Sequence, residues 1–508
     1  MRGLIRLAGL SFLLVVLAGC GQWPGADAAN PVAGSQAPGA VLPTAPIAGR
    51  NRHGFASQPD RGELAVYQPA LTRRDGAYTW HRADLSEEHA LRAIADGHLH
   101  VRTPAGDLLD VGFDRAIEHP SGDWTWVGHI AGHDDQQTIL TFGEHAAFGT
   151  IGQPAGQPLR LTVSDGASWM VETDSSQLVG LQRATPRGHN DFLMVPPKSA
   201  GTPGAQARGP QAQASVSAAA TTQATTTTVD IVLGYTTGFA TALGGTSAAV
   251  TRLNYLVDVA NAAYGNSQVA AKARLVATVA VSYPDATDND STLEKLTGYN
   301  STSNAQTTPD PAFNALRSAR EQYGADMVGL VRSFREPENG GCGLAWLIGG
   351  GRQPIDQSDS YFAYSVIGDG HDAGTNGHSY FCLDETLAHE LGHNMGLAHD
   401  QATAAGTDDT NNNGNPLDPE EYGRYVDSFG YTTGAGAGNF YTIMAVPAPG
   451  QAAYRVFSNP QLTTCGGFAC GVAGQADNVR TLNLTMPVIA GFRAPPPSTI
   501  TPKQTPGG

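Results

Sequence analysis

The chain has 508 residues, of which 41% are hydrophobic, and a formal net charge of −16. One hydrophobic core rarely extends over this length, so we expect two domains joined by connecting segments. The acidic balance argues against nucleic acid as a partner, because the phosphate backbone would repel such a surface.

Residues 1–20 have the character of an export signal. Two arginines accompany an apolar run that is too short to span a membrane as a helix of the mature protein. Residues 17–20, Leu-Ala-Gly-Cys, resemble a bacterial lipobox. This resemblance implies lipidation of Cys20 and an anchor in the outer membrane, since Gly21 differs from the aspartate of an inner-membrane retention signal. Ordinary cleavage near residues 26–28 is the alternative.

The next two segments are expected to differ in structure. Residues 21–54 are rich in Ala, Gly and Pro, which predicts a tether. Residues 55–196 contain short strand patterns at 124–128 and 159–163, and a hairpin signal around the turn at 104–106. The alternating apolar residues of that hairpin are Leu99, Val101, Leu109, Val111 and Phe113. We therefore predict a β-rich domain.

Two stretches lack the residues to form a core. Residues 197–228 consist mainly of Ala, Gly, Ser, Thr, Gln and Pro, and burial of so little apolar surface cannot offset the entropy of ordering. We expect a flexible and cleavable linker there. The tail at 494–508 contains three consecutive prolines and is expected to be disordered.

Residues 229–493 alternate between strand and helix patterns. The strands are expected over 229–235, 273–283 and 325–330, and helices over 246–264, amphipathic, and 311–323. This order predicts an α/β domain with a mixed sheet that leads into an active-site helix. The chain after that helix is expected to form a second, lower subdomain with little regular secondary structure.

The motif at 389–400 carries the chemistry. His389 and His393 are four residues apart, so on a helix both imidazoles project from one face and can bind one Zn²⁺. Glu390 lies beside the metal position, which suits a general base that acts on water. Gly396 can end the helix in the left-handed conformation, and His399 then supplies the third ligand. Three protein ligands leave one position open, as in catalytic sites.

The residues around the motif are compatible with a helix. Asp384 stands at a potential N-cap, and Glu385 would lie in the first turn near the positive end of the helix dipole. Leu387, Leu391 and Met395 provide an apolar side for packing while the histidines face a cleft.

The motif HExxHxxGxxHD resembles that of the metzincin metalloproteases. Asp400, directly after the third histidine, resembles the reprolysin-like branch. Residues 441–446 resemble the methionine turn of metzincins, with Met444 as the turn methionine. Val446 stands where astacins and serralysins have a tyrosine, which again favours the reprolysin-like branch.

Other strings are similar to bacterial peptidyl-Asp metalloendopeptidases. They include residues 229–235, 342–347 and 361–366 before the active-site helix and residues 488–493 after it. The resemblance implies a metzincin-like catalytic domain preceded by a propeptide-like β-rich domain. An independent β-domain that binds a partner is the alternative for the N-terminal region.

The cysteines point to an oxidising compartment. Without Cys20, the set is even: Cys342, Cys382, Cys465 and Cys470. The favoured pairs are Cys342 with Cys382 and Cys465 with Cys470, and two other pairings remain open. No other cysteine precedes the catalytic domain, which excludes a cysteine thiolate as an inhibitory zinc ligand.

The sequence leaves open whether the protein binds a second cation, Ca²⁺. Asp409, Asn411, Asn413 and Glu420 fit the EF-hand spacing for Ca²⁺, although Pro416 takes a position that is usually apolar. An ordinary loop rich in Asp, Asn and Gly is the alternative.

These patterns together predict an extracytoplasmic, monomeric zinc endopeptidase made as a lipid-anchored precursor with an inhibitory N-terminal region. A polypeptide substrate would pair with an exposed strand edge at 343–347. The alternatives are a lipid-anchored binding or adhesion module with a structural metal site and a hydrolase of non-protein amides. Arg332, Arg335 and Arg352 are candidates for a basic specificity pocket, but the sequence places none of them.

Overall fold

The computed structural model describes residues 59–133, 136–154, 156–178, 191–198, 226–375, 377–405, 417–448 and 450–494. The predicted signal with Cys20, the tether, the tail, most of the linker and three calcium candidates, Asp409, Asn411 and Asn413, lie outside the described residues. Within these ranges, no helix is long and apolar enough to cross a membrane.

The N-terminal region is a nine-stranded antiparallel sheet with the order β1-β2-β9-β8-β7-β6-β5-β4-β3. Its elements are β1 Ala65–Asp75, β2 Tyr78–Leu85, α1 Glu87–Asp96, β3 His98–Arg102, β4 Leu108–Glu118, β5 Trp124–His129, β6 Gln137–Phe142, β7 Ala147–Ile151, β8 Leu159–Ser164 and β9 Ala167–Thr173. Trp124 and Phe142 stack at 4.8 Å in its core. The predicted β-rich region and its hairpin at β3 and β4 are confirmed.

The C-terminal half is built on a mixed six-stranded sheet with the order β10-β16-β17-β15-β11-β12. The strands are β10 Phe192–Met194, β11 Thr227–Thr236, β12 Ala271–Val281, β15 Met327–Ser333, β16 Gly343–Leu347 and β17 Tyr364–Asp369. The pair β16–β17 is antiparallel, and the other four neighbouring pairs of this sheet are parallel. The predicted α/β architecture is therefore confirmed.

Helices and short strands complete this half. The helices are α2 Thr237–Leu243, α3 Thr246–Asn266, α4 Asn289–Thr297, α5 Asn314–Tyr323, α6 Thr386–Asn394, α7 Gln401–Ala405 and α8 Asn478–Ile489. Two-stranded ribbons join β13 Tyr299–Asn300 to β14 Ala305–Gln306, β18 His371–Ala373 to β19 Ser379–Phe381, β20 Ala398–Asp400 to β21 Phe429–Gly430, and β22 Phe440–Tyr441 to β23 Ala452–Ala453. The segment after α6 thus has little regular structure among its described residues.

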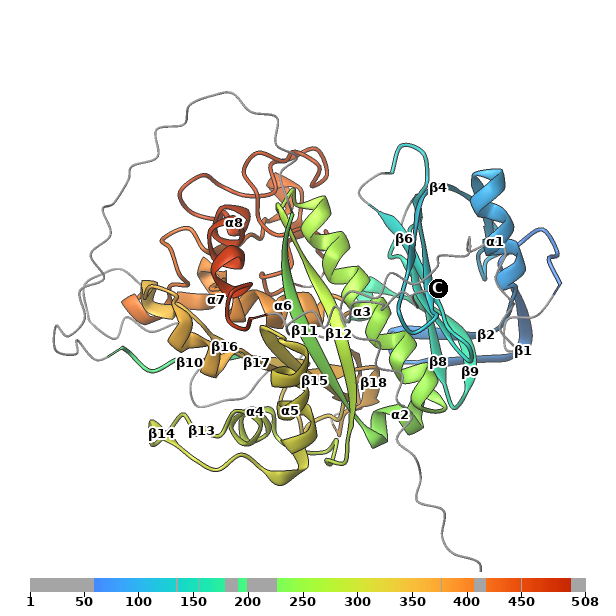
Figure 1. Ribbon diagram of the computed structural model, residues 1–508. Helices are drawn as coiled ribbons and strands as arrows, with labels where there is room; N and C mark the ends of the chain where they lie inside the picture. The colour runs from blue at the N-terminus through green and yellow to red at the C-terminus, as the bar shows by residue number, and fades with distance from the viewer. Residues whose placement is uncertain are drawn as a thin grey trace, which may run out of the picture. The chain divides into compact units, whose positions relative to one another are not determined.

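Helix α3 lies between the two large sheets (Figure 1). It contacts β12 on one side and β6 and β7 on the other. Its buried residues include the polar Arg252, Asn254 and Asp258. The expectation of an amphipathic helix is wrong, because the N-terminal sheet covers the face that would otherwise meet water.

The N-terminal sheet also supplies hydrogen-bond partners to α3. Thr125 Oγ1 donates to Asp258 Oδ2 at 2.5 Å, and Asn254 Nδ2 donates to Asp123 Oδ2 at 2.8 Å. All four side chains are buried. A buried polar group that lacks a hydrogen bond lowers the stability of the fold. These noncovalent contacts therefore stabilise the association of the two halves.

Two boundaries differ from the prediction. Strand β10 lies in the range assigned to the β-rich domain, yet it pairs with β16 of the C-terminal sheet. Strand β11 begins at Thr227, inside the predicted linker at 197–228, because its first residues already pair with β12. The structure contains the disulfides Cys342–Cys382 and Cys465–Cys470, the pairing that the sequence favours.

Candidate metal centre

Helix α6 begins after Glu385, which caps it without a side-chain hydrogen bond. The prediction of Asp384 as the N-cap is wrong. Its buried carboxylate instead accepts hydrogen bonds from Arg252 Nη2 at 2.6 Å and from the Tyr255 hydroxyl at 2.9 Å, both on α3. Burial alone would raise the pKa of Asp384, but Arg160 and Arg252 outweigh it and hold the pKa well below its usual range.

Three imidazoles meet at the C-terminal end of α6. His389 and His393 project from the helix, and Gly396, with φ of 90°, turns the chain so that His399 returns on β20. Nε2 of His389 lies 3.1 Å from Nε2 of His393 and 3.3 Å from Nε2 of His399. The three predicted ligands are therefore brought together.

Main-chain carbonyls orient two of these rings. Nδ1 of His389 lies 2.7 Å from the carbonyl oxygen of Ile443, and Nδ1 of His393 lies 2.8 Å from that of Leu397. A ring that donates from Nδ1 carries its lone pair on Nε2. The lone pairs thus point to the common centre, as they do in metal-ligating histidines.

The donor set fits Zn²⁺. Lone pairs at separations of 3.1 and 3.3 Å repel one another unless a cation lies between them. Ligands at about 2.0–2.1 Å from a tetrahedral zinc lie about 3.3–3.4 Å from one another. The observed separations agree with this value, so His389, His393 and His399 are suited to hold the ion.

The predicted methionine turn lies against α6. Met444 is fully buried, and a Cβ added to Gly392 would lie 2.6 Å from its sulfur, so only glycine permits this approach. Asp400 joins the turn to the third histidine, because its Oδ2 accepts a hydrogen bond from Val446 N at 3.1 Å. Ile443 of the same turn orients His389. The turn therefore packs against α6 and helps to fix the positions of the histidine ligands.

Glu390 is 1% exposed and lies against β16. A Cβ added to Gly343, the first residue of that strand, would overlap Oε1 of Glu390. The absence of a side chain at Gly343 thus creates the room for this carboxylate beside the metal position.

Asp191 is a site residue that the sequence analysis missed. Its side chain is 30% exposed, and its carboxylate lies 2.5 Å from Nε2 of His399, 3.0 Å from that of His393 and 3.3 Å from that of His389. These four residues form the metal-type cluster found in the described part of the chain. Asp191 lies 202 residues before His393, so no local spacing could connect them.

Burial and the contacts between the carboxylate and the imidazoles shift the pKa values of this cluster. Burial would raise the pKa of Asp191, but the three imidazoles outweigh it and hold the pKa well below its usual range. Burial lowers the pKa of His393 to about 4, and the neighbouring carboxylate only partly opposes this. At His389 the same carboxylate outweighs burial and raises the pKa.

The three arginine candidates for a specificity pocket have partners within the domain, and that of Arg335 is Asp372, whose Oδ1 lies 3.7 Å from Nη1. Arg332 is fully buried and donates to Thr287 and Asn289, each at 2.5 Å. The guanidinium of Arg352 stacks on the ring of Tyr422 at 4.8 Å. Arg332 is therefore part of the core and is not available to a substrate.

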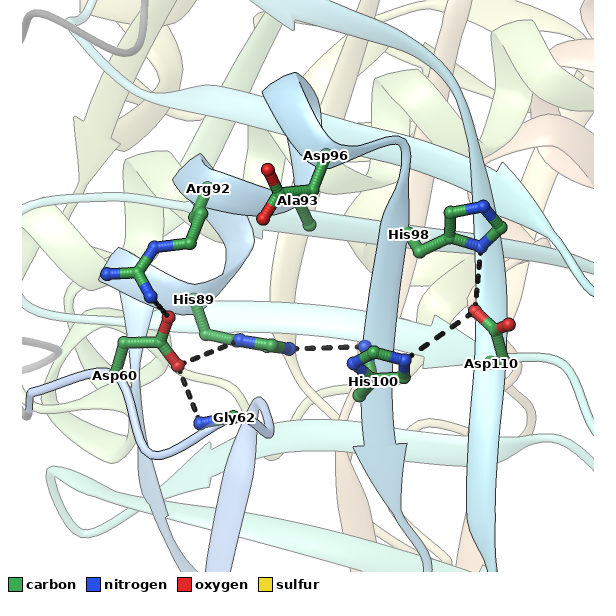
Figure 2. A pocket seen from close by; sticks show the side chains of 9 residues that line it. All are labelled: Asp60, Gly62, His89, Arg92, Ala93, Asp96, His98, His100 and Asp110. Carbon is green, nitrogen blue, oxygen red and sulfur yellow. Dashed lines mark hydrogen bonds and ion pairs between the residues drawn. The ribbon is translucent and has the colours of Figure 1, made fainter.

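A pocket in the N-terminal region is separate from the metal centre (Figure 2). His89 Nδ1 lies 2.9 Å from Asp60 Oδ1, and its Nε2 accepts a hydrogen bond from His100 N at 3.1 Å. His98 lies 2.9 Å from Asp110. These contacts join α1 to β3 and β3 to β4, and they give the pocket a structural explanation.

Comparison with known proteins agrees with this geometry. Residues 225–476 match the model of the reprolysin-like metallopeptidases of family M12B. These residues form a reprolysin-like metallopeptidase domain. The match covers α6, the three histidines and Met444.

Three curated relatives are called peptidyl-Asp metalloendopeptidase. The chain is 32% identical to that of Pseudomonas aeruginosa over 56% of this chain and 43% of the relative, so it spans less than half of that protein. It is 26% identical to that of Xanthomonas campestris over 73% of this chain and 76% of the relative. The relative from Stenotrophomonas maltophilia is 24% identical over 74% and 78%.

Metalloproteinase-II from Bacteroides fragilis is a solved structure with a TM-score of 0.33 and 13% identity, over 59% of this chain and 81% of that one. At this level the likeness does not bear on function.

We predict that His399→Ala lowers the zinc content well below about one equivalent per chain, since loss of a ligand should weaken binding at least as much as the 10–100-fold that follows loss of an outer-shell partner. Elemental analysis after dialysis measures this. His98→Ala is the matched control, because His98 is an exposed histidine of β3. Stoichiometric zinc in His399→Ala would refute the ligand assignment.

Proposed function

We propose that the protein is a zinc-dependent endopeptidase that hydrolyses internal peptide bonds of extracytoplasmic polypeptides and is made as a precursor with an inhibitory N-terminal region. The observation that carries this proposal is the meeting of three imidazole Nε2 atoms, two of them from α6 and one from β20, with Glu390 of α6 beside them. The family match of residues 225–476 supports the reaction class.

The residues of α6 and β20 have separate roles in the proposed reaction. The three histidines would hold Zn²⁺, which would supply Lewis acidity toward a water molecule and the scissile carbonyl. Glu390 accepts the proton of the attacking water and passes it to the leaving amine. The carbonyls of Ile443 and Leu397 keep two imidazoles in the ligating orientation.

Strand β16 would become an edge strand without β10, and it then suits an extended peptide. Its register with β17 leaves the opposite edge to a further strand, and β10 takes that place in this structure. A peptide paired there would lie beside Glu390, since Gly343 touches the glutamate. Main-chain pairing of this kind gives affinity with little dependence on sequence.

The names of the relatives suggest cleavage at aspartate, which we include as the candidate specificity. The family resemblance and 32% identity to the Pseudomonas protein support it. Because Arg332 belongs to the core, a basic group for an acidic side chain must come from another position.

A surface binding module with a structural metal site is the second candidate. It accounts for an anchor and for the β-rich N-terminal region. A structural site has no use for a buried carboxylate beside the metal, and Glu390 is 1% exposed there. The position of Glu390 therefore favours the endopeptidase.

The precursor is proposed to be lipid-anchored at Cys20 in the outer membrane. A cut in the linker would end the covalent connection to the anchor. The buried contacts Thr125–Asp258 and Asp123–Asn254 add a requirement to the expected release, because they must also be broken before the catalytic domain leaves.

Glu390→Gln should retain zinc and lose turnover by about 10²–10⁴-fold, because it removes the proton acceptor and keeps all three ligands. Hydrolysis of a quenched peptide and the zinc content are measured on the same sample after removal of the N-terminal region. Glu321→Gln is the control, since Glu321 is an exposed residue that pairs with Arg493. Wild-type turnover in Glu390→Gln would disprove the mechanism.

Latency predicts a difference between two forms of one preparation. A protease site placed between residues 199 and 225 allows the linker to be cut and the N-terminal fragment to be separated. The separated catalytic domain should hydrolyse peptides much faster than the intact precursor, because β10 no longer covers β16. Equal specific activity would sink the inhibitory role.

The anchor predicts the distribution of fragments in cells. After linker cleavage and separation, a lipidated N-terminal fragment should remain in the membrane fraction, and the catalytic fragment should be soluble. Fractionation with mass spectrometry measures both. An unlipidated N-terminus near Ala29 would exclude the anchor.

A further inference from the structure

The Asp191 carboxylate lies where a fourth ligand would lie. Its oxygens are 2.5–3.3 Å from the three Nε2 atoms, and those nitrogens are themselves 3.1 and 3.3 Å apart. The carboxylate contacts His399 and His393 more closely than two zinc ligands would, as an ion pair does, and a shift of under about 1 Å brings it to the spacing of a closed tetrahedral site. An ionised carboxylate is also a common zinc ligand.

Asp191 reaches this position on a segment that we call the strap, residues 191–198. The strap continues as β10, whose residues pair in parallel with β16 at Phe192↔Ala345 and Met194↔Leu347. The amide of Ala345 donates to the carbonyl oxygen of Asp191 at 3.3 Å. The strap thus takes both the fourth position at the metal and the strand edge proposed for substrate.

Packing holds the first end of the strap. The Phe192 ring is buried, and its centroid lies 5.1 Å from that of His393 and 5.7 Å from that of His399. Met194 packs close to Gly350, where an added Cβ would lie 2.8 Å from its methyl carbon. These contacts fix Asp191 against the imidazoles by more than charge.

An ionic contact holds the other end. Nζ of Lys198 lies 2.8 Å from a carboxylate oxygen of Asp356 and 2.7 Å from one of Asp359, which is 3% exposed. The backbone N–H of Lys198 donates to Gln353 Oε1 at 3.0 Å. A cut between residues 199 and 225 leaves all of these contacts in place, because the strap ends before it.

We propose that Asp191 is the fourth metal ligand of the precursor, and that displacement of the strap, rather than the linker cut, opens the metal to water and substrate. This inference rests on the proposed zinc site. It assigns latency to a carboxylate, as no cysteine other than Cys20 precedes the catalytic domain. Activation then requires a second event that removes the strap, such as proteolysis of the N-terminal region.

The test uses the full-length precursor with Co²⁺ in place of zinc, because the visible spectrum of cobalt reports its ligands without turnover. Azide, a small anion that binds an open position, is the probe. Wild-type precursor should not respond to azide, whether its linker is intact or cut but unseparated. Asp191→Ala and Asp191→Asn should both change the spectrum and respond to azide.

A second readout is the release of zinc to a chromogenic chelator. Asp191→Ala should lose zinc on the order of tenfold faster or more than wild type, as expected for loss of a ligand. Asp110→Ala is the matched control, because it removes an exposed carboxylate of the N-terminal sheet that is not part of the metal cluster. Its intact precursor should keep the wild-type cobalt spectrum, the wild-type azide behaviour and the wild-type rate of zinc release.

An azide response of wild-type precursor equal to that of Asp191→Ala would overturn the proposal, since the carboxylate would then only pair with imidazoles in the metal-free protein. Equal zinc release by the two proteins would do the same. Failure of wild type to bind any metal would instead contradict the proposed function. The two failures are therefore distinguishable.

Discussion

The site depends on one constraint: Nε2 of His389 is held 3.1 Å from that of His393 and 3.3 Å from that of His399, and the lone pairs of His389 and His393 are directed to a common centre. The lone pairs of neighbouring rings repel one another, so a cation or a proton between the rings is needed to stabilise this arrangement. The fold provides it through the turn at Gly396 and through carbonyls that receive the Nδ1–H groups of His389 and His393. Metal binding and the local structure of α6 are therefore coupled.

The N-terminal region contributes to both the stability and the state of this site. It provides partners for polar side chains that α3 buries, and α3 in turn binds Asp384 at the entrance to α6. It is also continuous in sequence with Asp191, whose carboxylate closes the ligand set. Under the proposed function, the same region would act both as an assembly partner and as an inhibitor.

The sequence predicts the zinc ligands because helical spacing is local: residues four apart share a face, so His389 and His393 need no tertiary information. It does not predict Asp191, whose position depends on the pairing of β10 with β16, a strand much later in the chain. It likewise misplaces Asp384 and treats α3 as amphipathic, since both depend on contacts between distant segments. Local patterns carry the ligand set, and long-range packing decides what surrounds it.

The measurement that tests the account most directly is X-ray absorption at the zinc edge of the zinc-loaded precursor and of the separated catalytic domain. We predict three imidazole nitrogens at about 2.0–2.1 Å in both, with a carboxylate oxygen as the fourth donor only in the precursor. His389, His393 and His399 supply the nitrogens and Asp191 the oxygen. A zinc shell without three imidazoles, or an identical shell in Asp191→Ala precursor, would contradict the account.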